Sequence, residues 1–361
     1  GLPRPYVTGE TIETAFTQLR GTDLPAQLGG RIDDLDSAAS LCTSLELETP
    51  SDQRADRVGN SVRCAVELSI LDAVTRSLEV PFSAVGECVP EAAPLRTDVP
   101  DVQYGAVLTA GSPLGEWTSA LKFRLYGFRD CKVKVGVDGQ SDAASLRRIR
   151  RLLPQHRVDL RADANEAWTL ENLEARLEPL RPFGLTSIEQ PVPDEQSDGL
   201  SRLRSKIDMP IMLDESLCSL DDARRAVELG TCDLFNIRIS KCGGYLGALR
   251  IAAIAHQAGL GYQLGCMVGE TGILSAAGRH FAVSVAGIRQ LEGSYDRHLV
   301  REPLTHEDLT FGYAGRAPRL SGPGLGVTVD ENALQRVTIA EEQWTIRHTR
   351  RETVAAPGDA H

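Results

Sequence analysis

The spacing of apolar residues changes once along this chain, from a helical period to an alternation of strands and helices. Over the first ~95 residues, apolar positions recur at i, i+3 and i+4 in TIETAFTQLR, DLDSAASLCTSL and SVRCAVELSILDAVTRSL, which predicts helices. In the third segment Val66, Ile70, Val74 and Leu78 are expected to lie along one apolar stripe. The Pro-rich stretch 89–100 predicts a connector to whatever follows.

Apolar runs of strand length alternate with helical patterns after this connector. The predicted strands are 102–109, 131–135, 158–163, 185–189, 210–214, 233–239, 262–268 and 288–293. Most of these runs are continuously apolar, as expected for a sheet that is covered on both faces. Seven crossovers joining eight such strands favour a closed (β/α)7β TIM-type barrel over an open sheet. The 361 residues leave room for a barrel of about 250 residues and an accessory domain.

The change in pattern divides the chain into three predicted regions. Residues 1–98 are expected to form an α-rich capping domain, and residues 99–300 the barrel. Residues 301–361 are rich in Gly and Pro, and we expect them to run back along the outside towards the N-terminal helices. The last residues, RRETVAAPGDAH, are expected to be frayed.

Composition narrows the classes of partner. The net charge is −11 and no Lys/Arg cluster stands apart from a helical pattern, so a nucleic-acid partner is not expected. No window approaches the ~20 apolar residues of a membrane span. The eight cysteines form no CxxC pair, which favours reduced, buried thiols and a cytoplasmic location. The start, GLPRPYVTGE, has neither the basic nor the apolar region of a secretory signal.

Three carboxylates recur once per predicted βα unit. Asp163 closes VDLRAD, Glu189 closes LTSIE and Asp214 closes PIMLD, at intervals of 26 (189 − 163) and 25 (214 − 189) residues. The C-terminal ends of barrel strands meet at one mouth, so these side chains are expected to converge there. Three carboxylates without His or Cys suit Mg²⁺. Any one of these Asp residues alone would be explained as a helix N-cap.

Two lysines flank the carboxylates at similar intervals. Lys134 lies 29 residues before Asp163, and Lys241 lies 27 residues after Asp214. The second and sixth strands of a barrel stand on opposite sides of the mouth, so a substrate between them would meet one lysine on each face. We expect like-charge repulsion from Lys132 to lower the pKa of Lys134, and Arg238 could act similarly on Lys241. The alternative is that both lysines only neutralise the carboxylates through ion pairs.

This arrangement favours proton abstraction next to a substrate carboxylate. The enolate that forms carries a second negative charge, which a divalent cation would stabilise. Lysines on opposite faces would support racemisation, whereas one lysine acting alone would support cycloisomerisation or elimination. Two alternatives remain. One is a Schiff-base enzyme that uses Lys134 or Lys241, and the other is a barrel without catalytic activity.

At these residues the chain resembles the enolase superfamily, in the muconate-lactonizing-enzyme (muconate cycloisomerase) subgroup. The matching motifs are KVK (132–134), RADANEAW, SIEQPV, LDES and NIRISKCGG. The resemblance implies Mg²⁺ held by Asp163, Glu189 and Asp214, Lys134 and Lys241 as the acid/base pair, and a small carboxylate as substrate. It also implies supporting or substrate-binding roles for Lys132, Asn165, Glu215, Asn236, Arg238, Glu270 and Asp296.

The resemblance leaves the reaction open and has three departures. A muconate-cycloisomerase-like reaction or a racemase/epimerase is expected, with an o-succinylbenzoate-synthase-like elimination, a dipeptide epimerase or an N-acylamino acid racemase as alternatives. Strand eight reads LEGSYD, without the Asp-x-Asp of dipeptide epimerases, and Arg238 stands where members often have Lys. The family's N-terminal β-hairpin region is expected to be missing, because GLPRPYVTGE resembles the segment just after it. This architecture commonly forms homo-oligomers.

Overall fold

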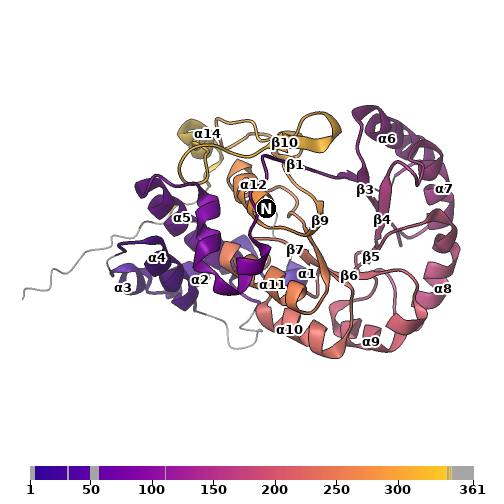
Figure 1. Ribbon diagram of the computed structural model, residues 1–361, viewed down its shortest axis with the longest axis horizontal. Coiled ribbons are helices and arrows are strands. Elements are labelled where there is room, and N and C mark those ends of the chain that lie inside the picture. The colour runs from indigo at the N-terminus through magenta and orange to yellow at the C-terminus, as the bar shows by residue number, and fades with distance from the viewer. Residues whose placement is uncertain are drawn as a thin grey trace, which may run out of the picture.

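The computed structural model describes residues 5–30, 32–48, 57–109, 111–339, 341 and 343. The part before residue 100 is helical, as the apolar spacing predicts, and most of it lies on one side of the molecule (Figure 1). Its helices are α1 (Pro5–Thr8), α2 (Ile12–Gly21), α3 (Leu24–Leu28), α4 (Leu35–Ser44) and α5 (Asn60–Ser77), followed by the 3₁₀ turns η1 (Phe82–Cys88) and η2 (Pro90–Leu95).

Eight parallel strands form a curled sheet in the order in which they follow along the chain. They are β2 (Ala106–Leu108), β3 (Asp130–Lys134), β4 (Asp159–Asp163), β5 (Ile188–Glu189), β6 (Ile211–Leu213), β7 (Leu234–Ile237), β8 (Gly261–Leu264) and β9 (Ile288–Leu291). The two edges of the sheet meet where the Gly105 N–H donates to the Leu291 carbonyl at 2.8 Å. The predicted (β/α)7β barrel is confirmed.

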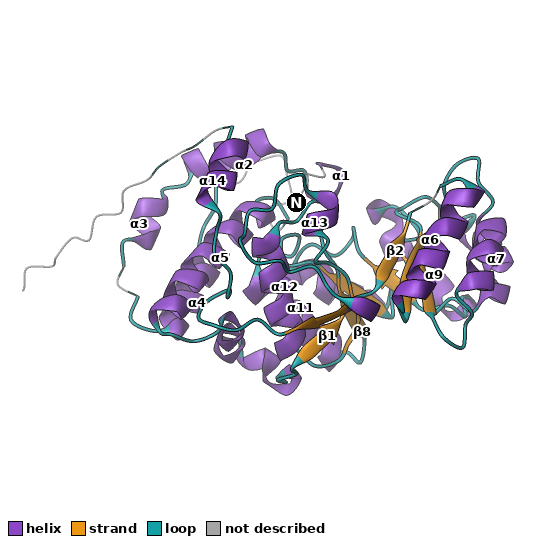
Figure 2. Cartoon of the chain, turned by 90° about the horizontal axis from the view of Figure 1, so that it is seen from above, coloured by secondary structure: helices purple, strands orange, loops and turns teal. Residues whose placement is uncertain are grey.

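Helices make the seven crossovers and cover the outside of the barrel (Figures 1 and 2). They are α6 (Pro113–Tyr126), α7 (Asp142–Leu152), α8 (Leu173–Leu177) with η3 (Glu178–Phe183), α9 (Leu200–Leu203) between η4 (Asp194–Gly199) and η5 (Arg204–Lys206), α10 (Leu220–Leu229), α11 (Tyr245–Gln257) and α12 (Gly272–Ser284). Strands β6 and β7 are buried along their whole length, which explains their continuous apolar sequence.

The run 102–109, expected to be one strand, is two. β1 (Asp101–Gln103) pairs antiparallel with β10 (Arg316–Pro318) in a separate sheet, and only β2 belongs to the barrel. Tyr104 and Gly105 carry the chain from one sheet to the other. A Cβ on Gly105 would lie 2.2 Å from Oδ1 of Asp130, so a larger residue here would displace a carboxylate that pairs with Arg161.

The apolar stripe expected along α5 is not its most buried face, although Ile70 and Val74 pack partly buried against the core. The residues that α5 buries include Cys64, Leu68 and Leu71, whereas Leu78 is 43% exposed. The buried face is rotated because it also carries Asn60 and Glu67, two polar residues that the apolar period leaves out.

The segment after the barrel contacts η1 and α5 of the N-terminal part. It contains α13 (Asp296–Leu299), η6 (Tyr313–Gly315), β10 and α14 (Glu331–Val337). The Phe82 N–H donates to the Gly324 carbonyl at 2.8 Å, and the Arg76 guanidinium donates to the Val327 carbonyl at 2.7 Å. Figure 2 shows α14 among the N-terminal helices, at the end of the molecule away from α7. The RRETVAAPGDAH segment lies outside the described residues.

The cysteines and the lengths of the helices bear on the predictions made from composition. All eight cysteines are free, and six of them are buried, as expected for reduced thiols. Of the helices in the described ranges, none combines the length and the apolar character that crossing a membrane requires.

Candidate active site

The barrel brings the three predicted carboxylates together at one end. Strand register places Lys134 beside Asp163 and Asp163 beside Glu189, on β3, β4 and β5. Asp214 follows the last residue of β6, at the corresponding end of the next strand. All three carboxylates are at most 1% exposed. The C-terminal ends of the strands therefore form a buried acidic centre from residues that are far apart in sequence.

Cations engage each of these carboxylates. The Lys132 ammonium lies 3.3 Å from Oδ2 of Asp163 and 3.2 Å from Oε1 of Glu189. The Arg238 guanidinium pairs with Asp214 and lies 3.6 Å from Oε1 of Glu189. With these pairs in place, no group of three His, Cys, Asp or Glu side chains in the described ranges is arranged to hold a metal ion.

The protonation of Glu189 nevertheless fits a divalent cation. Burial, and then the charge of Asp163, raise the pKa of Glu189 to about 8 in spite of Lys132. Glu189 is thus a buried carboxyl that holds its proton more tightly than usual, mainly because water is excluded from it. A hard cation with oxygen ligands would supply positive charge there, so the donor set suits Mg²⁺.

The two lysines reach this centre from opposite sides. Strands β3 and β7 are four positions apart in the eight-stranded order, which places them across the barrel from each other. Nζ of Lys134 lies 2.6 Å from Oδ2 of Asp163, and the Lys134 side chain is 27% exposed. Nζ of Lys241 lies 2.7 Å from Oδ1 of Asp214 and is buried.

Lys241 and Asp214 hold each other in their charged forms. Burial lowers the pKa of Lys241, but the Asp214 carboxylate outweighs it and the pKa is raised. Burial raises the pKa of Asp214, yet Arg238 and then Lys241 hold it well below its usual range. Arg238 does lower the pKa of Lys241, as expected. The Asp214 carboxylate has the larger effect, so the pKa of Lys241 is raised overall.

The predicted supporting residues connect the lysines to the carboxylates. Asn165, in left-handed backbone at φ 43°, accepts from Lys134 and donates to Oε1 of Glu215 at 3.1 Å. Burial, with the charge of Asp214, raises the pKa of Glu215 to about 7. Asn236 donates to Oε1 of Glu189 at 2.8 Å.

The loops after β8 and β9 hold the remaining predicted residues. Oε1 of Glu270 accepts the Met267 N–H at 2.6 Å, and burial raises the pKa of Glu270 to about 7. Glu270 also lines a small cavity of about 10 Å³ at the ends of these strands. Asp296 is the first residue of α13, and its side chain lies outside the described part of the structure.

Sequence reasoning missed a layer of charge beneath the mouth. Glu292, at 5% exposure, lies 2.9 Å from the Lys132 ammonium and pairs with Arg161 at 2.5 Å. Arg161 is fully buried and also pairs with Asp130 at 2.5 Å. Glu292 stands at the end of the predicted strand 288–293, as Glu189 stands at the end of 185–189, so position alone would have indicated it.

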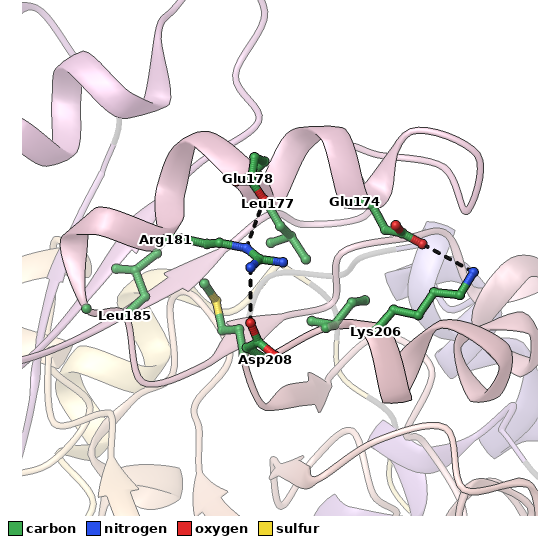
Figure 3. A pocket seen from close by; sticks show the side chains of 10 residues that line it. Glu174, Leu177, Glu178, Arg181, Leu185, Lys206 and Asp208 are labelled. Atoms are coloured by element: carbon green, nitrogen blue, oxygen red, sulfur yellow. Dashed lines mark hydrogen bonds and ion pairs between the residues drawn. The ribbon is translucent and has the colours of Figure 1, made fainter.

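A larger surface hollow lies at the other end of the barrel. Its volume is about 300 Å³, and its lining includes Leu185 and Asp208, which precede β5 and β6 (Figure 3). Its charged rim is internally paired, with Arg181 3.1 Å from Asp208 and Lys206 3.8 Å from Glu174. It contains none of the predicted catalytic residues and lies at the end of the strands opposite the active-site mouth.

Comparison with known proteins is consistent with this geometry. A family model described as "Enolase C-terminal domain-like" matches residues 118–333. The chain is 27% identical over 347 residues to an N-succinyl-L-Arg/Lys racemase from Bacillus cereus, covering 95% of this chain and 86% of the relative. It is 32% identical over 332 residues to an L-Lys-D/L-Arg epimerase from Methylococcus capsulatus, covering 90% and 85%. An o-succinylbenzoate synthase from Geobacillus stearothermophilus is 28% identical over 338 residues, covering 92% and 82%.

Solved structures share the fold. The N-succinyl Arg/Lys racemase from Bacillus cereus superposes with a TM-score of 0.80 at 24% identity, covering 94% of this chain and 86% of that chain. A dipeptide epimerase from Methylococcus capsulatus, complexed with a Mg ion, has a TM-score of 0.73 at 26% identity and covers 91% and 88%.

Proposed function

The chain belongs to the enolase superfamily, in the mandelate racemase/muconate lactonizing enzyme subgroup, and from this premise we propose that it is a Mg²⁺-dependent racemase or epimerase of N-acylated amino acids or dipeptides. The observation that supports this reaction most is the placement of Lys134 and Lys241 on opposite sides of one acidic centre. Relatives with racemase and epimerase activity favour it over the cycloisomerase-like reaction.

Asp163, Glu189 and Asp214 are the residues that would hold the metal. Their oxygens come from adjacent strands and are buried, and burial together with Asp163 raises the pKa of Glu189. Bound there, Mg²⁺ would supply positive charge for the substrate carboxylate and for the enolate that develops from it. Lys132 contacts both Asp163 and Glu189, so it would hold these two ligands in place from below.

The two lysines divide the proton transfer between the faces of the substrate. Lys241 is kept protonated by its contact with Asp214, and the protonated amine is the form that delivers a proton. Lys134 is the more accessible of the two, and Asn165 and Asp163 orient its amine. We propose that each lysine removes the α-proton of one stereoisomer and that the other returns a proton to the opposite face.

The substrate class follows from the relatives together with the site. Two of the relatives are an N-succinyl-L-Arg/Lys racemase and an L-Lys-D/L-Arg epimerase, and substrates of these kinds carry an α-proton beside a carboxylate. A test would incubate the enzyme and Mg²⁺ with L and D forms of N-succinyl-arginine, N-succinyl-lysine and Ala-containing dipeptides. Chiral chromatography should show interconversion of at least one pair. Conversion of none, with Mg²⁺ bound, would contradict the proposed reaction.

Elimination is the second candidate, supported by the 28% identity to an o-succinylbenzoate synthase. The same carboxylates and lysines would serve it, with the acid lysine protonating a departing hydroxyl group. Loss of water from a hydroxy acid, without interconversion of stereoisomers in the panel above, would favour this reaction. Borohydride trapping of a covalent lysine adduct would instead favour the Schiff-base alternative.

A further inference from the structure

Helix α5 contacts the loop that carries Lys241, although the two are far apart in sequence. The buried side-chain amide of Asn60, the first residue of α5, donates to the Lys241 carbonyl at 2.7 Å. The same amide donates to the Cys218 carbonyl at 2.8 Å. Cys218 follows Asp214 in the loop after β6, so one amide group fixes the backbones of two loops at the barrel mouth.

A second residue of α5 holds the far side of the Lys241 loop. Oε1 of Glu67 accepts the N–H groups of Tyr245 and Leu246, the latter at 3.1 Å, where α11 begins. The N–H groups in the first turn of a helix have no acceptor within the helix, and a carboxylate there accepts their hydrogen bonds. The Lys241 loop is therefore fixed at the lysine itself and again four residues later.

Two glycines allow this close approach. Gly243 and Gly244 adopt φ of 79° and 124°, a region that favours glycine. A Cβ on Gly243 would lie 3.0 Å from Oδ1 of Asn60, and a Cβ on Gly244 would lie 2.4 Å from Oε1 of Glu67. The glycines after Lys241 thus serve the contact with α5.

The start of α5 is itself fixed to the barrel. The guanidinium of Arg57, three residues before Asn60, pairs with Asp222 at 2.7 Å and with Asp194 at 2.5 Å. Asp222 lies in α10 and Asp194 in η4, so these ion pairs reach two crossovers. Arg57 and Asp222 are buried, which makes the position of Asn60 on the barrel well defined.

We propose that Asn60 is a positioning residue, through which helix α5 holds the backbone of Lys241 so that its amine meets the substrate. This inference rests on the proposed role of Lys241 in proton transfer. Lys134 has no contact with α5 in the described structure, since its amine bonds to Asp163 and Asn165. Loss of the Asn60 amide should therefore affect the face served by Lys241 more than the face served by Lys134.

The variants Asn60→Asp and Asn60→Ser test this on the full chain. Asn60→Asp keeps the shape but places acceptors against two carbonyls, while Asn60→Ser is neutral and too short to reach them. Ser69→Ala is the matched control, because Ser69 is exposed on α5 and its hydroxyl bonds only to the Val66 carbonyl of the same helix.

The first readout needs no substrate. The buried thiols of Cys218 and Cys242 adjoin the two loops that Asn60 fixes, whereas Cys131 lies buried in β3. Loss of the amide should make N-ethylmaleimide label Cys218 and Cys242 roughly tenfold faster through local opening, with Cys131 unchanged. Unchanged labelling of Cys218 and Cys242 would overturn the proposal, whether or not the enzyme is a racemase.

The second readout is kinetic. We expect kcat to fall by about 10²-fold, the cost of misplacing a reacting group by an ångström, with KM changed far less. In D₂O, exchange of the α-proton should slow for the stereoisomer that Lys241→Ala also impairs, and much less for the other. Equal slowing of both stereoisomers would reduce Asn60 to a structural residue and overturn the proposal. If the wild-type enzyme exchanges neither stereoisomer, the proposed function fails while the labelling still decides whether Asn60 holds the loop.

Discussion

Lys241 and Asp214 meet at 2.7 Å at the mouth of the barrel, each holding the other in its charged form. One is the predicted acid/base residue and the other a predicted metal ligand, and they come from neighbouring strands, β7 and β6. Any change in the contacts of Asp214 therefore reaches the proton on Lys241.

Replacing either lysine should strongly reduce turnover. We expect Lys134→Ala and Lys241→Ala to lower kcat by about 10²–10⁴-fold, the usual contribution of a general acid or base, with the fold intact. Circular dichroism would check the fold and chiral chromatography the rate. Lys206→Ala, in the hollow at the other end of the barrel, is the control and should keep full activity. Wild-type activity in either of the first two variants would remove that lysine from the mechanism.

Asp214→Asn should weaken Mg²⁺ binding sharply. An amide oxygen carries no charge, and a hard divalent cation depends on carboxylates for its affinity. Isothermal calorimetry with Mg²⁺ would measure the loss directly. Asp208→Asn, an exposed carboxylate at the opposite end of the barrel, is the matched control. Equal affinity in the Asp214 variant and the wild type would refute its assignment as a ligand.

Glu67 should make stability fall as pH rises. Burial raises its pKa from 4.5 to about 7, so between these values the folded protein keeps a proton that the unfolded chain has lost. The contribution is present in full below pH 4.5 and is lost by about pH 7, which amounts to at most about 3 kcal/mol. Glu67→Gln still accepts the α11 N–H groups but does not titrate. Urea unfolding at pH 5 and pH 8 should give wild type a steeper decline than the variant, and parallel declines would show that Glu67 does not titrate there.

Glu292→Ala should destabilise the fold. Burial raises the pKa of Glu292, but Lys132 and Arg161 draw it down to about 2, so it is a buried anion between two buried cations. Removing one member of such a cluster typically costs about 3–5 kcal/mol. Urea denaturation would measure the change. Glu302→Ala, which removes a partly exposed pair with Arg336, should cost less than about 1 kcal/mol. Similar costs for the two variants would show that the buried layer contributes little.

The sequence predicts the barrel and its central residues because both follow from short-range rules. A carboxylate or lysine that closes an apolar run, once per βα unit, must lie at the mouth of a parallel barrel. That rule places Lys134, Asp163, Glu189 and Asp214 correctly beside one another. Glu292 also ends a predicted strand, but Arg289 and Gln290 interrupt the apolar run before it, so its signal in the sequence is weaker.

Contacts between distant segments lie outside such rules. The buried face of α5 contains Asn60 and Glu67, which no apolar period indicates, because their partners lie 181 and 178 residues away. The split of 102–109 depends likewise on β10, more than 200 residues later. The domain boundaries, a cytoplasmic location and a homo-oligomeric state stay predictions from sequence and family resemblance.

The most direct test is exchange of the α-proton in D₂O, followed by NMR, with the L and D forms of N-succinyl-lysine supplied separately. With Mg²⁺ the α-proton signal of both forms should decay, and EDTA should stop the decay. Lys241→Ala should still exchange the form whose proton faces Lys134, and Lys134→Ala the other form. Decay that persists in EDTA, or in a variant lacking both lysines, would contradict a metal-assisted mechanism with two lysine bases.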